Sequence, residues 1–75
     1  MASLPKYIQI ADTLRAEIGS KTYPLGAKLP PETQLCKRFD ASRFTIREAI
    51  KKLASEKLVK TERGAGTTVV SLVSE

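Results

Sequence analysis

The apolar residues near the start of the chain recur at the spacing of an amphipathic helix. When the sequence is wound at about 100° per residue, they fall within one arc. The residues of this arc are Tyr7, Ile10, Ala11, Leu14 and Ile18. Pro5 is accepted in a first helical turn, because its missing N–H group would have no partner there. The pattern therefore predicts a helix over residues 5–18, which Gly19 ends.

The following stretch, residues 21–31, contains three prolines and a glycine, so we expect a loop. Within it, Lys28 and Leu29 form at most a strand of one or two residues. A short helix is expected over residues 31–39. Its apolar face consists of Leu35, Cys36 and Phe39. We interpret Cys36 as a small core residue, because a reactive thiol would need an activating partner.

A third helix is expected over residues 42–56. Ser42 suits its N-cap, because the side-chain oxygen can accept a hydrogen bond from a free backbone N–H group. The apolar face of this helix consists of Ile46, Ala49, Ile50 and Leu53. The opposite face carries Arg43, Phe44, Arg47 and Lys51. One helix thus combines a side suited to a core with a strongly basic side.

The end of the chain has the pattern of a hairpin. Val59–Glu62 and residues 67–70 contain β-branched residues and lie on either side of the sequence RGAG. Two helices joined by a three-residue turn and followed by a hairpin make a winged helix-turn-helix. The predicted fold class is therefore mainly α with a small β-hairpin: a winged helix-turn-helix of three helices plus a wing.

Composition limits the chain to one small domain. Its 75 residues, of which 41% are apolar, suffice for a single core. The one cysteine excludes an internal disulfide. No apolar run approaches the roughly 18 residues of a membrane span, and the N-terminus lacks the apolar region of a signal peptide. We therefore expect a cytoplasmic protein with no membrane partner.

The net charge is +5, and the basic excess lies in the middle of the chain. Between residues 28 and 63 there are ten Lys or Arg and five Asp or Glu. This distribution indicates either a polyanionic partner or a solvated surface. There is no histidine and no carboxylate pair placed for catalysis, so we do not expect an enzyme. No catalytic residue, cofactor site or metal ligand is assigned.

The basic face of the third helix suits the major groove of B-DNA, where a helix reads base edges. Arg43 and Arg47 can each bind guanine O6 and N7 through two parallel hydrogen bonds. Lys51 lies one turn further on and suits a phosphate, as do the hydroxyl groups of Ser42 and Thr45. The alternative is a basic face that water alone contacts.

Phe44 and the hairpin tip each have a structural and a functional interpretation. The ring of Phe44 could meet a thymine methyl group or tuck against the preceding helix. Glycines in the tip could simply supply the positive φ of a tight turn. Alternatively, Gly64 and Gly66 let the backbone approach a sugar–phosphate strand, with Arg63 at the minor groove.

Over about residues 5–69, these features resemble the DNA-binding domain of the GntR family of bacterial transcription regulators. The motifs are PKYIQIADTLRAEI, LGAKLPPETQLCKRF, ASRFTIREAIKKLASEKLV and RGAGTTV. In this family, arginines placed like Arg43 and Arg47 contact bases or phosphates. Hydroxyl groups placed like Ser42 and Thr45 hold the DNA backbone. The glycine placed like Gly64 lies at the wing tip in the minor groove.

Four positions depart from the family pattern. Thr33 stands where an arginine often touches DNA, and this position makes it a candidate contact. Pro31 stands where a serine cap is common, which implies a weaker cap. Phe44 replaces a threonine or another small residue, which implies a different operator preference. Lys57 replaces a glycine after the third helix, which implies strain at that corner or an added phosphate contact.

The resemblance also implies the wider assembly. Residues 1–75 would be the DNA-binding domain of a repressor, whose C-terminal domain, absent here, binds a small-molecule effector and dimerises. Residues 42–56 would enter the major groove and residues 62–68 the minor groove of an inverted-repeat operator, while the 75-residue chain alone would be a monomer. SRFTIREA followed by GAGTTV is similar to the HutC-like subgroup. The alternative is a winged-helix module that binds RNA or a protein.

Overall fold

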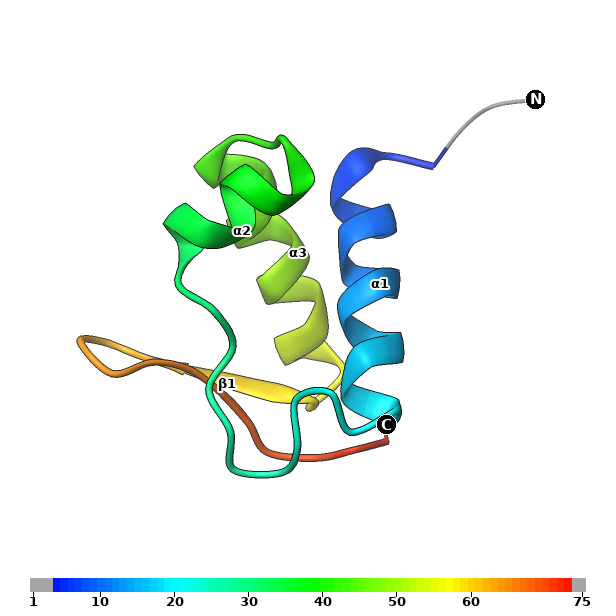
Figure 1. The fold of residues 1–75 in the computed structure, drawn as a ribbon, viewed down its shortest axis with the longest axis vertical. Helices are drawn as coiled ribbons and strands as arrows, with labels where there is room; N and C mark the ends of the chain where they lie inside the picture. The colour runs from blue at the N-terminus through cyan, green and yellow to red at the C-terminus, as the bar shows by residue number, and fades with distance from the viewer. Residues whose placement is uncertain (1–3, 74–75) are drawn as a thin grey trace.

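The computed structural model describes residues 4–73 of the chain. Three helices precede a two-stranded antiparallel sheet (Figure 1). The elements are α1 (Lys6–Gly19), α2 (Glu32–Phe39), α3 (Arg43–Ser55), β1 (Val59–Glu62) and β2 (Gly66–Val69). Each begins and ends within one residue of its predicted bounds. The winged helix-turn-helix fold class is therefore confirmed.

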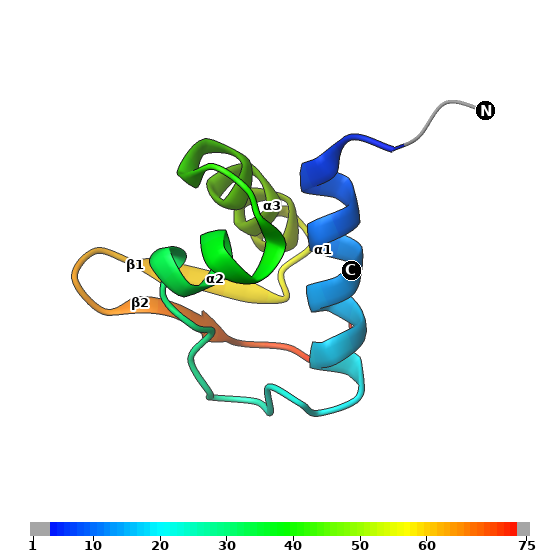
Figure 2. The same cartoon turned by 45° about the horizontal axis from the view of Figure 1, so that its top comes forward.

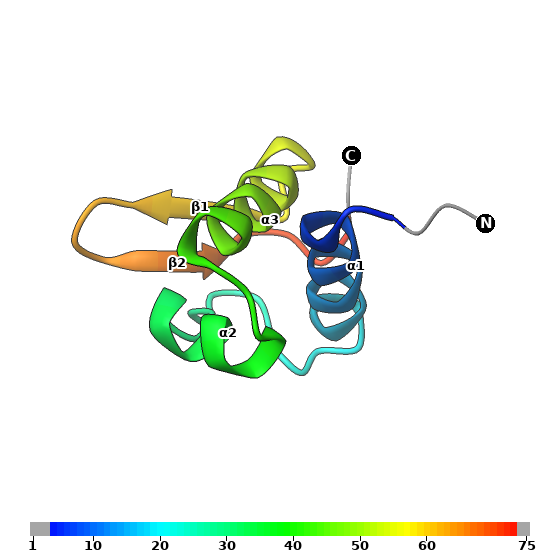
Figure 3. The same cartoon turned by 90° about the horizontal axis from the view of Figure 1, so that it is seen from above.

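The core forms where the apolar faces of α1 and α3 meet (Figure 3). Its buried helical residues are Ile10, Ala11, Leu14, Ile18, Leu35, Ile46, Ala49, Ile50 and Leu53. The hairpin closes the core with Leu58, Val59 and Val69. Cys36 is half-buried and packs against this core, as interpreted from the sequence. The basic face of α3 is left outside because its apolar face is used for packing.

The turn between α2 and α3 is held by backbone geometry and by two side chains. Asp40 ends α2 in the left-handed conformation, which aspartate tolerates better than most residues. Lys6 donates a hydrogen bond from Nζ to the carbonyl oxygen of Asp40 at 2.6 Å. Ser42 caps α3 as predicted, because its Oγ accepts from the backbone N–H of Thr45 at 3.2 Å. Pro31 gives α2 no side-chain cap, also as expected.

The wing is anchored on one side by the loop that precedes α2. Lys28 forms a single antiparallel bridge with Thr68 of β2, which is the one- or two-residue strand expected there. Across the hairpin, Glu62 is paired with Gly66, so β2 begins one residue earlier than predicted. The tip projects away from α1 (Figure 2). The wing therefore stands beside α3 with its base fixed and its tip exposed.

The end of α3 is tied to α1 by an ion pair. Arg15 donates from Nε and Nη2 to the two carboxylate oxygens of Glu56, at 2.7 and 2.6 Å. Lys52 Nζ lies 3.3 Å from the same carboxylate. The hydrogen bond from Arg15 holds the pKa of Glu56 below its ordinary value. Lys57 follows with a φ of 63°, a region that favours glycine, so the strained corner implied by this substitution is present.

Candidate nucleic-acid interface

The predicted basic arc of α3 faces solvent. Phe44 is 74% exposed, so its ring is not tucked against α2. The side chains of Arg47 and Lys51 are 63% and 81% exposed, and Arg43 is exposed as well. The buried residues of α3 hold the opposite side of the helix against α1. The four side chains can therefore meet a partner without any change in the core.

The two hydroxyl residues at the start of α3 are engaged with each other. Ser42 Oγ lies 3.1 Å from Thr45 Oγ1, and it also accepts from the Thr45 backbone N–H. Each hydroxyl carries one donor hydrogen, and only one of the two is needed for the hydroxyl–hydroxyl contact. The pair therefore caps the helix and keeps one O–H group to donate to an anion. The prediction that both hold a phosphate stays a prediction.

Arg47 has a partner that the sequence reasoning missed. Its Nε donates to Glu32 Oε2 at 2.9 Å, which joins α3 to the first residue of α2. This hydrogen bond is the main reason why the pKa of Arg47 is raised, and the negative charge of the Glu32 carboxylate adds to the effect. Lys51 has a looser pairing, with Nζ 3.7 Å from Glu48 Oε2 on the same helix. The i,i+3 spacing of Glu48 and Lys51 could have predicted their pairing from the sequence. No local pattern predicts the contact between Arg47 and Glu32, which lie on different helices.

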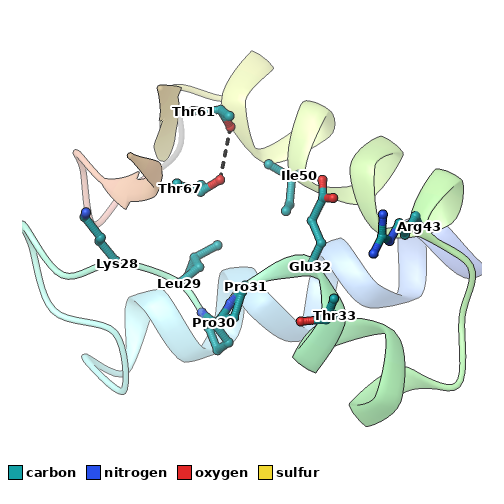
Figure 4. A pocket seen from close by; sticks show the side chains of 11 residues that line it. Lys28, Leu29, Pro30, Pro31, Glu32, Thr33, Arg43, Ile50, Thr61 and Thr67 are labelled. Atoms are coloured by element: carbon teal, nitrogen blue, oxygen red, sulfur yellow. Dashed lines mark hydrogen bonds between the residues drawn. The ribbon is translucent and has the colours of Figure 1, made fainter. Parts of the chain in front are cut away.

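A hollow of about 480 Å³ lies between the start of α2, α3 and the wing (Figure 4). It brings together Thr33 and Arg43, two predicted contacts that are ten positions apart in the sequence. At its other end, the hydroxyl groups of Thr61 and Thr67 are 3.1 Å apart and join β1 to β2. Gly66 also lines this hollow. Three predicted site residues thus share one concave surface.

A second hollow, of about 750 Å³, lies between the exposed face of α3 and β1. Phe44, Arg47 and Lys51 line it from the helix, and Lys60 lines it from the strand. Lys60 is exposed and was missed by the sequence reasoning, which considered only the wing tip. Glu32 and Glu48 also line it, but the three basic side chains, Arg47, Lys51 and Lys60, outnumber these two acids. The hollow therefore suits a negatively charged backbone.

The wing tip lies outside both hollows. Arg63 and Gly64 are exposed and line neither of them. The backbone N–H of Ala65 donates to the carbonyl oxygen of Glu62 at 3.1 Å, which closes a turn with Gly64 at φ 79°. A Cβ added to Gly64 would meet nothing within 4 Å, so the turn needs glycine for its φ and not for lack of room. The tip is therefore a separate contact point.

Residues 4–73 contain no group of three His, Cys, Asp or Glu side chains that could hold a metal ion. Within the same residues, no helix is both long enough and apolar enough to cross a bilayer.

The fold and the exposed basic helix define a winged helix-turn-helix protein with a candidate nucleic-acid interface. The sequence model described as "Bacterial regulatory proteins, gntR family" matches residues 6–69. The chain therefore belongs to the GntR family of bacterial regulatory proteins, as the resemblance predicted.

Curated relatives are regulators of greater length. A putative L-lactate dehydrogenase operon regulatory protein of Escherichia coli (strain K12) is 41% identical over 71 residues, covering 92% of this chain and 28% of the relative. The mannosyl-D-glycerate transport/metabolism system repressor MngR of the same strain is 36% identical over 69 residues, covering 92% and 29%. The chain thus spans less than a third of the length of these relatives.

Solved structures include DNA complexes. The crystal structure of AraR(DBD) in complex with operator ORR3 has a TM-score of 0.88 and 36% identity, covering 92% of this chain and 83% of that chain. A GntR family transcriptional regulator from Listeria monocytogenes has a TM-score of 0.85 and 30% identity, covering 93% and 61%. The fold is therefore shared along nearly the whole of this chain.

Proposed function

We propose that this chain binds double-stranded DNA in a sequence-specific manner, as part of a bacterial transcription repressor. In this proposal, residues 42–56 enter the major groove and residues 62–68 reach the minor groove. The observation that carries it is the exposed arc of Arg43, Phe44, Arg47 and Lys51, on a fold that matches a domain solved with operator DNA. The family consists of regulatory proteins, and no enzymatic role is assigned.

Arg43 and Arg47 are proposed to read bases, because both are exposed near the N-terminal half of α3 and arginine matches guanine bidentately. Phe44 follows Arg43 in the sequence and offers an exposed apolar ring to a thymine methyl group. Thr33 borders the same hollow as Arg43, so we keep it as a candidate contact to the DNA backbone.

The phosphate contacts are proposed at both ends of the interface. Lys51 is exposed in the third turn of α3, one turn beyond Arg47, and the hydroxyl pair of Ser42 and Thr45 marks the start of α3. At the wing, Arg63 is proposed to enter the minor groove. Gly64 and Gly66 are proposed to let the backbone approach the sugars closely, since neither carries a side chain.

The wider assembly is also a proposal. Residues 1–75 are proposed to be one DNA-binding domain, followed in the full-length protein by a domain that binds a small-molecule effector and dimerises. A homodimer would match an inverted-repeat operator with two equivalent half-sites. Cytoplasmic location and the HutC-like subgroup belong to the same proposal; the latter rests on SRFTIREA followed by GAGTTV. The fold of the effector-binding domain would test the subgroup.

The test begins with selection of duplexes from a random pool, followed by titration of four variants. Arg43→Ala and Arg47→Ala should each weaken binding to the selected site by about 1–3 kcal/mol and relax preference at one position. Lys51→Ala and Arg63→Ala should weaken binding to all sequences evenly and lower the salt slope by about 1 each. If the arginine variants retain wild-type affinity and preference, α3 is not the reading helix.

Binding to double-stranded RNA is the alternative, since the same basic face would attract any polyanion. The deep, narrow major groove of A-form RNA does not admit a helix, so contacts would be confined to phosphates and 2′-hydroxyl groups. Titration with a DNA duplex and an RNA duplex of the same sequence separates the two. Tighter binding to RNA would contradict the proposed function.

A further inference from the structure

We propose that Glu32 is a positioning residue that fixes the guanidinium of Arg47 for end-on recognition of guanine. This inference rests on the proposed function. Its starting point is the hydrogen bond from Arg47 Nε to Glu32 Oε2, at 2.9 Å, between two helices that form the helix-turn-helix. The carboxylate reaches from the start of α2 towards Ile50 of α3 (Figure 4).

The hydrogen bond to Glu32 leaves the terminal nitrogens of the Arg47 guanidinium available for another partner. A guanidinium has five N–H donors, and Nε carries one of them. Within residues 4–73, the contact with Glu32 is the one hydrogen bond found for the Arg47 side chain, so the two terminal nitrogens keep their donors. Two parallel N–H groups are what guanine O6 and N7 accept. Glu32 thus binds the guanidinium at Nε and leaves the two terminal nitrogens, Nη1 and Nη2, free to donate to a base.

Stability alone gives a weak reason for this pair. The side chains of Arg47 and Glu32 are 63% and 35% exposed. Exposed ion pairs contribute little to folding, because water screens the charges and both side chains lose rotamer freedom. A carboxylate at a surface that binds phosphates also repels the ligand. Glu32 therefore weakens the general attraction to DNA, so any benefit of this carboxylate to binding has to come from its contact with Arg47.

Positioning acts on specificity and not on general affinity. A free arginine samples many rotamers and can reach phosphates as well as bases, whereas a held arginine has already lost part of that freedom. Binding also removes water from the interface, which strengthens the attraction between the two charges. The wild-type chain should therefore favour guanine over other bases at the position that Arg47 contacts, more than an unheld arginine would.

Glu48 provides a charge-matched control. It lies on α3, lines the same hollow as Arg47, and its Oε2 is 3.7 Å from Lys51 Nζ. Glu48→Gln removes one negative charge from the interface, as Glu32→Gln does, but it does not touch the Arg47 guanidinium. A purely electrostatic role for Glu32 would make the two variants behave alike.

The experiment uses two duplexes. One is the selected site, and in the other the guanine at which Arg47→Ala relaxes the base preference is replaced by another base. Dissociation constants are measured at one salt concentration for the wild type, Glu32→Gln, Glu32→Ala and Glu48→Gln. A bidentate arginine–guanine pair gives a preference of about 5- to 150-fold. We expect this ratio to fall about threefold in Glu32→Gln, which keeps an acceptor oxygen, and about fivefold in Glu32→Ala. Glu48→Gln should tighten binding to both duplexes while the ratio stays within about twofold.

A double-mutant cycle completes the test. In the Arg47→Ala background, Glu32→Ala should leave the ratio unchanged, because there is no guanidinium to hold. An unchanged or larger ratio in Glu32→Ala would overturn the positioning role. If the wild-type chain selects no preferred sequence from the random pool, the proposed function itself would be overturned. Circular dichroism and melting temperature of each variant show whether its fold is retained.

Discussion

Replacing Glu56 by Gln tests the link between α3 and α1. The wild-type carboxylate receives two hydrogen bonds from Arg15, at 2.7 and 2.6 Å, and lies 3.3 Å from Lys52 Nζ. The side chains of Arg15 and Glu56 are 29% and 18% exposed. The substitution keeps the shape and one acceptor oxygen, but it removes the charge and replaces the other acceptor by an NH₂ group. That group faces the Arg15 guanidinium, which is also a donor.

The expected loss of stability follows from these contacts. A hydrogen bond to a charged group contributes about 1.5–3 kcal/mol net when it is well shielded from water. Partial exposure reduces this value, and Arg15 retains Asp12 as a second partner. We therefore expect Glu56→Gln to lower the free energy of unfolding by about 1–2 kcal/mol. For a domain of this size, the melting temperature should fall by about 4–16 °C.

The loss should depend on pH in a defined direction. The pKa of Glu56 is lowered in the folded state, chiefly by the Arg15 hydrogen bond, from an ordinary value of 4.5. A lowered pKa contributes stability that is fully present above the unfolded-state pKa and is lost as pH falls through the folded-state pKa. The difference between wild type and Glu56→Gln should thus be constant near pH 7 and shrink below pH 4.5.

The assay is urea denaturation of both proteins at a series of pH values from about 7 to 3. Glu48→Gln is the control, because its partner Lys51 is 81% exposed and lies 3.7 Å away. That variant should change the unfolding free energy by less than about 0.5 kcal/mol. A cost for Glu56→Gln that equals the control, or that stays constant at low pH, would refute the role of the ion pair.

Three further predictions concern the interface and the assembly. Phe44→Thr should change base preference at one or two operator positions with little effect on melting temperature, because the ring is 74% exposed; a large drop in melting temperature would show that it supports the fold. Gly64→Ala should cost about 1 kcal/mol in urea denaturation, because φ is 79° although a Cβ meets nothing within 4 Å; an unchanged midpoint would contradict this strain. Sedimentation should show that the 75-residue chain is a monomer. The monomer should bind an isolated half-site weakly and with steep salt dependence, because it lacks the gain in avidity of about 10²–10⁴ that a linked dimer has. A stable dimer or salt-independent binding would contradict that prediction.

The sequence by itself determined the elements and the orientation of α3. Helical spacing of apolar residues and the Ser42 cap are local properties, because they depend on neighbours within one or two turns. The same spacing placed Arg43, Phe44, Arg47 and Lys51 on one side, and burial of the opposite side confirms that these residues face solvent. Their contacts with DNA stay predictions.

Only the tertiary structure decided which distant residues meet. Glu32 holds Arg47 because the turn at Asp40 brings the start of α2 close to α3, and Arg15 reaches Glu56 because α1 packs along α3. These pairs are 15 and 41 positions apart, beyond the range of helical spacing. Charges so far apart in the chain meet only after the core has fixed the helix positions, so no local pattern of residues could have predicted either pair.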